Sequence, residues 1–247
     1  MSDPDKKSSP RRRKGAPSAA VLDQDMIVRA TLDLINEEGL DAFTLRALAK
    51  RLGVFPTAIY WHIPNRNEML SRAVALALED VVPARRNPDW REYLKAILTR
   101  TRKAIQKRPN IAPLVATQMV SNTHTSFKFV EEILLILDQA NCAGANMVAA
   151  YNFVNSSIVG FTTQEFAPLP KDDPEAWQEQ QKERLASIDK RRFPTLAANA
   201  NYLVGRSFAL RFESGEKRPL DDSFDLFVAA VIGGIEKLAS QEPARLD

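Results

Sequence analysis

The chain has 247 residues, of which 45% are hydrophobic and 26% are charged, and its formal net charge is +3. These values are typical of a soluble globular protein with one large or two modest domains. The single cysteine, Cys142, excludes an internal disulfide. No stretch reaches the ~18 apolar residues of a membrane span, and the N-terminus has no apolar signal core, so we expect a cytoplasmic protein.

The spacing of apolar residues predicts the fold class. Many windows repeat with the 3.6-residue period of a helix, no long stretch alternates as a strand would, and the chain has only 9 glycines, so we expect an all-helical fold. An enzyme is a competing hypothesis. However, the chain has 2 histidines and 1 cysteine, no glycine loop that could hold a phosphate, and no cluster at metal-ligand spacing. We therefore predict no catalytic residue, no metal and no cofactor.

The N-terminal tail, residues 1–20, is basic. It carries six Lys and Arg side chains against Asp3 and Asp5, a charge of +4, so the remaining chain sums to −1. Its Ser, Pro and Gly content is typical of a segment that is disordered in isolation. Such a tail either keeps the protein in solution or forms an arm that reaches nucleic-acid phosphates or a minor groove, and we favour the arm.

Two helices are predicted after the tail. The first spans residues 24–38, with Asp23 as its N-cap and Gly39 at its end. The second runs from Thr44, which can cap it, to Leu52, and Gly53 ends it as a left-handed residue. Apolar residues at helical spacing give each helix one buried face: Ile27, Ala30, Thr31, Leu34 and Ile35 in the first, and Leu45, Leu48, Ala49 and Leu52 in the second.

The next segment, residues 54–63, is too short and too aromatic to be stable as a helix alone. Pro56 suits its first turn, and Val54, Ile59 and Ile63 can face inward. Asn65 and Glu68 form a capping box that starts a further helix. Two short helices that meet at a glycine, the second aromatic and flanked by basic residues, indicate a helix-turn-helix whose second helix enters the DNA major groove.

These residues also carry a family resemblance. The motif Leu52-Gly53-Val54, Ile59-Tyr60-Trp61-His62-Ile63 and Asn65-Arg66, preceded by Gly39-Leu40, Phe43-Thr44-Leu45-Arg46 and Leu48-Ala49, resembles the tetracycline-repressor (TetR) family of bacterial transcription regulators. The resemblance covers roughly the first third of the chain. It implies that DNA is contacted by Arg46, Thr57, Ala58, Tyr60, His62 and Arg66.

Each of these residues also has an ordinary structural alternative. The two arginines could be solvated surface charges, and Tyr60 and His62 could be packing residues, but within this motif we favour DNA contact. Trp61 either packs or lies near phosphates. The chain departs from the family pattern in two places: Phe55 stands where a small hydroxyl residue usually caps the recognition helix, and Thr57-Ala58 stands where Gly-Thr is common.

The rest of the chain is predicted to form a second helical unit. The helix that starts at Asn65 should run to about Val82, where Pro83 stops it. We then expect helices over residues 88–107, 123–139, 143–166, 174–190 and 196–204, a broken segment over 110–120, a loop over 206–219, and a last helix from a cap at Asp222 or Ser223 to about residue 240. Helix 123–139 is apolar on all sides, which favours burial in the centre of the unit.

The last helix contains two adjacent glycines, Gly233 and Gly234, which suggest close packing of another backbone because glycine weakens a helix. Packing within the monomer is one interpretation. We favour a homodimer in which this helix and helix 143–166 form a four-helix bundle across a two-fold axis, an arrangement that the resemblance also implies. The expected domains are therefore a DNA-binding helix-turn-helix domain over residues 21–83 and a helical effector-binding and dimerisation domain over 84–247.

The predicted function is a sequence-specific DNA-binding regulator, most simply a repressor that binds a palindromic operator as a homodimer and is released by a small-molecule effector. Candidates for contact with the effector are Tyr151, Asn155 and Thr162, which lie among apolar residues as pocket side chains do. A protein-interaction scaffold whose helix-turn-helix no longer binds DNA is the alternative, and Phe55 is the feature that favours it.

Overall fold

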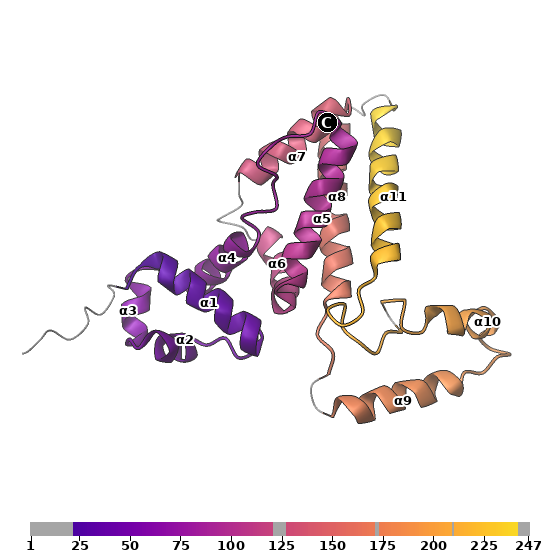
Figure 1. Ribbon diagram of the computed structural model, residues 1–247, viewed down its shortest axis with the longest axis horizontal. Helices are drawn as coiled ribbons and strands as arrows, with labels where there is room; N and C mark the ends of the chain where they lie inside the picture. Colours follow the sequence, from indigo (N-terminus) through magenta and orange to yellow (C-terminus); the bar gives the residue numbers. More distant parts are fainter. Residues whose placement is uncertain (1–21, 121–126, 171–172, 209, 242–247) are drawn as a thin grey trace, which may run out of the picture.

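The computed structural model describes residues 22–120, 127–170, 173–208 and 210–241, and every regular element within these ranges is a helix (Figure 1). The all-helical prediction is therefore confirmed, while the basic tail, residues 1–20, lies outside the described residues. The helices are α1 (Gln24–Glu38), α2 (Leu45–Leu52), α3 (Pro56–Tyr60), α4 (Arg66–Ala77), α5 (Trp90–Gln106), the 3-10 helix η1 (Pro109–Ile111), α6 (Ala112–Val120), α7 (Phe127–Gln139), α8 (Gly144–Glu165), α9 (Pro174–Ala186), α10 (Pro194–Leu203) and α11 (Asp221–Ala239).

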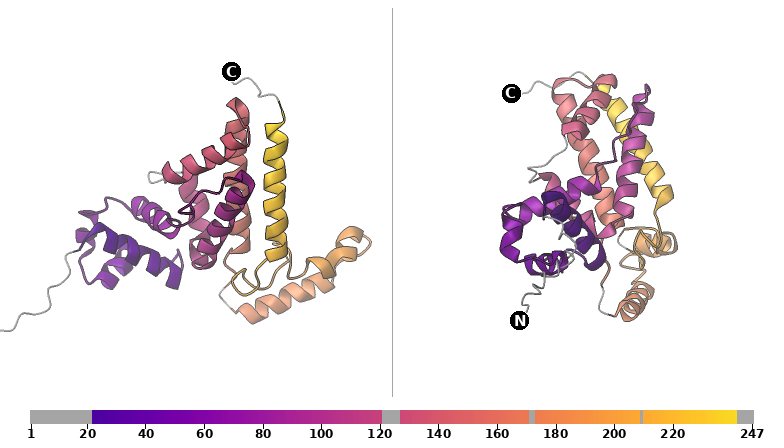
Figure 2. Two further views of the ribbon diagram at one scale, coloured as in Figure 1. Left: turned by 45° about the horizontal axis from the view of Figure 1, so that its top comes forward. Right: turned by 60° about the vertical axis from the view of Figure 1, so that its left-hand side comes forward.

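The helices form two units and an arm. Helices α1 to α4, which we call the N-terminal unit, lie on one side of the molecule (Figure 1). Helices α5 to α8 and α11, the C-terminal unit, form an upright bundle in which α5, α8 and α11 run side by side (Figure 2). Helices α9 and α10, the arm, project away from the base of this bundle.

Local capping sets the ends of the first helices as predicted. The side chains of Asp23, Thr44 and Asn65 accept hydrogen bonds from backbone N–H groups three residues later, at 2.7, 3.1 and 2.8 Å. Gly53 ends α2 with φ of +67°, a left-handed conformation that glycine adopts without steric cost. These caps hold α2 and α3 in a fixed turn.

The core of the N-terminal unit extends beyond its own helices. Buried side chains of α1, α2, α3 and α4 form one cluster that also includes Ile105, Ile111, Leu114, Val115 and Phe166 from the other unit. Two hydrogen bonds follow the same path, from Asn110 to the carbonyl oxygen of Asn36 at 2.8 Å and from Gln118 to Asn67 at 3.1 Å. The N-terminal unit is therefore packed against η1 and α6 without a break.

The core of the C-terminal unit combines apolar side chains with buried charges. Helices α5, α7, α8 and α11 bury a cluster that includes Tyr93, Ile133, Val154 and Phe224. At its base the carboxylate of Glu165 on α8 receives two hydrogen bonds from the Arg102 guanidinium on α5, at 2.8 and 2.6 Å. The backbone N–H of Leu220 donates to the same carboxylate at 2.9 Å, so this ion pair ties the start of α11 to α5 and α8.

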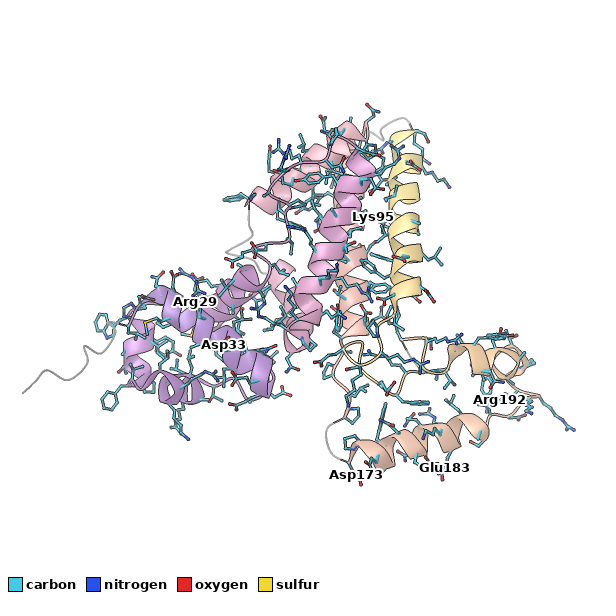
Figure 3. The ribbon with its side chains drawn as sticks, in the orientation of Figure 1. Arg29, Asp33, Lys95, Asp173, Glu183 and Arg192 are labelled. Carbon is cyan, nitrogen blue, oxygen red and sulfur yellow. The ribbon has the colours of Figure 1, made fainter. Side chains whose placement is uncertain are left out.

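The arm differs from both units because neither α9 nor α10 has a buried residue. Figure 3 labels Asp173 and Glu183 along α9 and Arg192 at the turn toward α10, all remote from the bundle. The predicted polar helix of residues 174–190 thus exists but ends at Ala186. The predicted loop after α10 returns to the bundle, where Arg211 donates hydrogen bonds to the backbone carbonyls of Glu165 and Ala167.

Three further helix predictions were wrong. Helix α4 ends at Ala77, five residues before Val82, because the acidic residues that follow are unfavourable at the negative end of the helix dipole. The predicted broken segment contains α6, which accommodates Pro113 because a proline in the first turn loses no helical hydrogen bond. Helix α11 begins at Asp221, so neither Asp222 nor Ser223 caps it, and Leu220 precedes it without a side-chain cap.

Two packing predictions also need correction. Helix α7 is not buried on all sides, because it turns Glu132 and Ile133 inward and leaves Phe127 exposed. Of the two glycines in α11, only Gly234 has a close neighbour within the monomer: a Cβ there would lie 2.9 Å from the Phe153 ring, whereas a Cβ on Gly233 would meet nothing within 4 Å. Packing within the monomer thus explains Gly234, and Gly233 lies on the open face.

Candidate nucleic-acid interface

Helices α2 and α3 present a buried back and an exposed front. The back is apolar and tightly packed, since Leu48, Ile59 and Ile63 have no exposed surface at all. The front carries Phe55, Tyr60 and Trp61, whose side chains are 82%, 45% and 88% exposed. Phe127 and Tyr202, elsewhere in the described residues, are 87% and 71% exposed, so it is the neighbouring arginines Arg46 and Arg66, and not exposure alone, that mark this front as a candidate contact surface.

Most of the predicted DNA-contacting residues are exposed on or beside α2, α3 and the start of α4. Arg46 is exposed in the first turn of α2, and Thr57 and Tyr60 are exposed on α3, with Trp61 directly after it. Arg66 is the first residue of α4. Its guanidinium carbon lies 5.3 Å from the centroid of the Phe43 ring, a cation–π contact that holds the charge beside the helix start.

Ala58 and His62 are half-buried. The backbone N–H of Ala58 donates to the Phe55 carbonyl oxygen at 2.9 Å, which forms the first turn of α3. The carbonyl oxygen of His62 accepts a hydrogen bond of 2.9 Å from Gln24 of α1. The backbone around His62 is therefore held by α1.

Residues that brace this front were not predicted. Arg72 on α4 donates to Gln24 at 2.5 Å and to Glu68 at 2.9 Å, so one arginine joins α4 to α1. On the opposite side Arg51 of α2 forms two hydrogen bonds with Glu37 of α1. The bond from Arg51 holds the pKa of the Glu37 carboxyl below its usual value. The Arg51–Glu37 and Arg72–Gln24 pairs have no sequence signal, because their members are 14 and 48 residues apart, whereas Glu68 and Arg72 have the i, i+4 spacing of a helix pair.

The comparison with known protein families decides the identity of this unit. Residues 27–73 match the profile of the bacterial regulatory proteins of the tetR family, and residues 82–238 match the tetracyclin repressor-like C-terminal domain. The second match alone covers more than half of the chain. The chain belongs to the TetR family. The resemblance drawn from its helix-turn-helix is thus confirmed, and TetR-family proteins are transcriptional regulators rather than enzymes.

Individual relatives of this TetR-family chain agree with that assignment. The tetracycline repressor protein class C of Escherichia coli is 26% identical over 224 residues, which cover 88% of this chain and 92% of the relative. An HTH-type transcriptional regulator of Saccharopolyspora erythraea is 26% identical over 156 residues, which cover 63% of this chain and 66% of the relative, just under two thirds of its length.

Solved structures share the fold of this TetR-family chain. ActR of Streptomyces coelicolor, in complex with actinorhodin, has a TM-score of 0.69 at 20% identity, covering 90% of this chain and 99% of ActR. BioQ, solved with its double-stranded DNA operator, has a TM-score of 0.61 at 19% identity, covering 87% of this chain and 99% of BioQ. At these identities the likeness establishes the fold.

The three effector candidates of this TetR-family chain lie on α8 in different settings. Tyr151 and Asn155 are half-buried, and the Asn155 side-chain amide donates to the Tyr151 carbonyl oxygen at 3.0 Å, leaving its own buried Oδ1 without a hydrogen-bond partner. Thr162 is buried, and its hydroxyl donates to the Ile158 carbonyl oxygen at 2.7 Å. Asn155 thus offers a free acceptor, whereas the Thr162 hydroxyl proton is engaged within the helix.

The part of this TetR-family chain that the structure describes contains neither a metal-binding cluster nor a membrane-spanning helix. There, no three His, Cys, Asp or Glu side chains come together where they could hold a metal ion. None of the helices in the same ranges is both long enough and apolar enough to cross a membrane.

Proposed function

We propose that this protein is a ligand-responsive transcriptional repressor that binds a palindromic DNA operator as a homodimer and leaves it when a small-molecule effector binds. The observation that carries the DNA-binding part is the exposed aromatic and basic front of α2 and α3 over a back with no exposed surface. Only a partner that covers this front removes its apolar side chains from water. Because the partner is the chromosome, the proposal places the protein in the bacterial cytoplasm.

The side chains of the front suit the two kinds of DNA contact. Arg46 and Arg66 carry charges for phosphates, and the backbone N–H groups at the start of α4 favour the same anion. Thr57, Ala58, Tyr60 and His62 are on or beside α3, where short and hydrogen-bonding side chains can reach base edges in the major groove. Trp61 is exposed at the end of α3 and contacts the sugar-phosphate backbone in this proposal.

A dimer is part of the proposal because one five-residue recognition helix reads too few bases. Helices α8 and α11 lie side by side and leave an apolar surface exposed, which includes Val148, Phe153 and Leu226 together with small residues such as Gly233. A second copy of the chain placed on this surface completes a four-helix bundle. It also sets two recognition helices about one DNA turn, ~34 Å, or a multiple apart.

The response to an effector is proposed to pass through α6 and α4. Gln118 of α6 is buried, donates its side-chain N–H to Asn67 of α4, and has a buried carbonyl oxygen without a hydrogen-bond partner. Because Arg66 precedes Asn67 on α4, a shift of α6 moves a DNA contact directly. Asn155, with its own free acceptor, and Tyr151 and Thr162 are the proposed effector contacts on α8. An effector that binds the shifted state more tightly than the DNA-bound state lowers operator affinity, and one with equal affinity for both does nothing.

The experiment is selection of bound duplexes from a random DNA pool by the purified protein, followed by measurement of affinity for the recovered sequence. We expect a palindrome with half-sites at least one helical turn apart. The variant Arg46→Ala/Tyr60→Ala should lose at least tenfold in operator affinity, since base and charge contacts contribute roughly 1–3 kcal/mol each. It should retain the circular dichroism spectrum and melting temperature of the wild type, because both side chains are exposed.

A control variant removes the same charge at a remote position. Arg192 lies at the far end of the arm (Figure 3), so Arg192→Ala should keep full operator affinity. If no motif is recovered and binding disappears at moderate salt, the protein has only non-specific affinity for DNA. The interaction-scaffold hypothesis would then replace the repressor.

A further inference from the structure

Phe55 is the side chain at the front that the family pattern does not account for. It lies between Gly53, which ends α2, and Pro56, the first residue of α3, and its ring is 82% exposed. It occupies the N-cap position of α3, yet its side chain makes no capping hydrogen bond. A serine, threonine, aspartate or asparagine is strongly preferred at such a position, and a phenyl ring cannot cap.

Phe55 therefore breaks two local rules at once. It gives up the cap of a helix that is too short to be stable alone, and it keeps a large apolar ring in water in the free protein. No stability gain compensates within the chain, because so exposed a ring buries little surface. Residues that break local rules in this way are expected where function requires them.

The chemical groups in the DNA major groove indicate which of them a phenyl ring can contact. Base edges in the groove present hydrogen-bond donors and acceptors, with one apolar group, the C5-methyl of thymine, which phenylalanine can contact. The ring belongs to the segment that leads into the recognition helix, whose N-terminal residues face base edges in helix-turn-helix proteins. We propose that the Phe55 side chain recognises a thymine methyl group in each operator half-site.

The surrounding residues restrict the backbone from which the ring projects. Val54 N–H donates to the Ala49 carbonyl oxygen at 3.0 Å, and the proline ring of Pro56 restricts the backbone on the other side. Ile59, one turn further along, is completely buried and anchors α3 to the core. The proposed contact is made by the Phe55 ring itself and does not use the backbone N–H groups of α3.

The test uses the selected operator and rests on the proposed function. Each symmetric pair of thymines is replaced by deoxyuridine, which removes the methyl group and leaves base pairing intact, and affinity is measured for the wild type and for Phe55→Ala. At one symmetric pair the wild type should lose roughly fourfold per half-site, or about fifteenfold in all, the value of one buried methyl group. Phe55→Ala should bind both duplexes within about twofold.

The variant must be separated from a folding defect. Phe55→Ser offers a capping hydroxyl to α3, so it should melt at or above the wild-type temperature while it loses the same discrimination between thymine and uracil. Tyr202 on α10 is an exposed aromatic residue of the arm, and Tyr202→Ala should keep the wild-type discrimination.

Two results would overturn the inference. Equal losses in the wild type and in Phe55→Ala at every thymine pair would show that the methyl group is read by another side chain or through DNA shape, and not by Phe55. A selected half-site without thymine would contain no methyl group for Phe55 to contact and would contradict the inference. In both cases a palindrome has been recovered, so the DNA-binding part of the proposed function stands. Failure to recover any operator would instead remove the proposed function and this inference together.

Discussion

In the N-terminal unit, Arg51 holds Glu37 through hydrogen bonds of 2.7 and 2.6 Å, and in the C-terminal unit Arg102 holds Glu165 through bonds of 2.8 and 2.6 Å. Both pairs have two bonds of similar length, although Arg51 uses its two terminal nitrogens and Arg102 uses Nε and one terminal nitrogen; the larger difference is in their surroundings. The side chains of the first pair are 33% and 54% exposed, whereas those of the second are 10% and 0% exposed. Water screens the first pair, while the second depends on its partner because a buried carboxylate without one is costly.

The two units therefore use charge differently. In the N-terminal unit the charges lie outside an apolar core, and the caps of the helices are local. In the C-terminal unit a carboxylate is at the centre of a set of bonds that includes the Leu220 N–H, and the Arg102 guanidinium lies 4.5 Å from the Phe224 ring centroid. Burial opposes the charged form of Arg102, but its bonds to Glu165 and Asp221 outweigh this and raise its pKa. The surface of the first unit is free to carry function, and in the second unit these bonds join α5, the end of α8 and the start of α11.

The largest expected effect comes from breaking the buried pair. Arg102→Met keeps an apolar stem beside the Phe224 ring but leaves the Glu165 carboxylate buried and unpaired, which costs about 3–5 kcal/mol. We expect the melting temperature, followed by circular dichroism, to fall by on the order of 10 °C.

A double variant shows whether the charge is the cause. Arg102→Met/Glu165→Gln removes both charges and keeps an acceptor for the Leu220 N–H, so it should recover much of the lost stability. If the double variant were as unstable as the single one, packing rather than the unpaired charge would explain the loss.

A smaller effect is expected at Glu132, which is buried on α7 and bonded to Arg86 at 2.8 Å and to the Tyr93 hydroxyl at 3.0 Å. The bond from Arg86 lowers the pKa of Glu132 below its ordinary value of about 4.3. A carboxyl whose pKa is lower in the folded state contributes stability above its unfolded pKa and loses it as the pH falls through the folded pKa. Glu132→Gln should therefore flatten the decline of melting temperature below about pH 4.3.

The exposed pair provides the reference for that measurement. The pKa of Glu37 is lowered in the same direction by Arg51, but this pair is open to solvent and salt. Glu37→Gln should change the acid profile less than Glu132→Gln does. A larger change at Glu37 would contradict the view that burial decides the energetic weight of these ion pairs.

The smallest expected effect is that of Arg51→Gln on stability near neutral pH. The variant removes an ion pair between two exposed side chains, and such pairs contribute little after side-chain entropy and screening. We expect no measurable change in melting temperature at physiological salt, and unchanged affinity for the selected operator. A loss of operator affinity without a loss of stability would mean that Arg51 itself contacts DNA.

The contrast between local caps and distant ion pairs also explains which features could be predicted from the sequence. Thr44, Gly53 and Asn65 act on backbone groups within about four residues, so the turn of the helix-turn-helix was predictable from its sequence, and the structure confirms it. Arg102 and Glu165 are 63 residues apart, and Arg86 and Glu132 are 46 apart, so no periodicity reveals them. The DNA-contacting and effector-contacting roles of individual residues stay predictions.

Boundaries failed where tertiary packing or electrostatics overrides local spacing. The apolar run of α7 suggested a fully buried helix. The sequence does not show that Glu132 of this helix also faces inward, because its partner Arg86 lies 46 residues away. The early end of α4 depends on acidic residues that periodicity ignores. The departure of Phe55 from the family pattern could be seen in the sequence, but the exposure of its ring depends on the tertiary structure.

The apolar cluster that runs from α1 to α4 into Ile105, Ile111, Leu114, Val115 and Phe166 has a consequence for protein engineering. Sensors are commonly built by joining the DNA-binding segment of one regulator to the ligand-binding segment of another. A junction placed in the loop between α4 and α5 would set these five side chains against an unfamiliar surface and create cavities or clashes. A transplant from this protein should therefore carry along with the first four helices the matching side chains of η1 and α6, together with Ile105 of α5 and Phe166 at the end of α8.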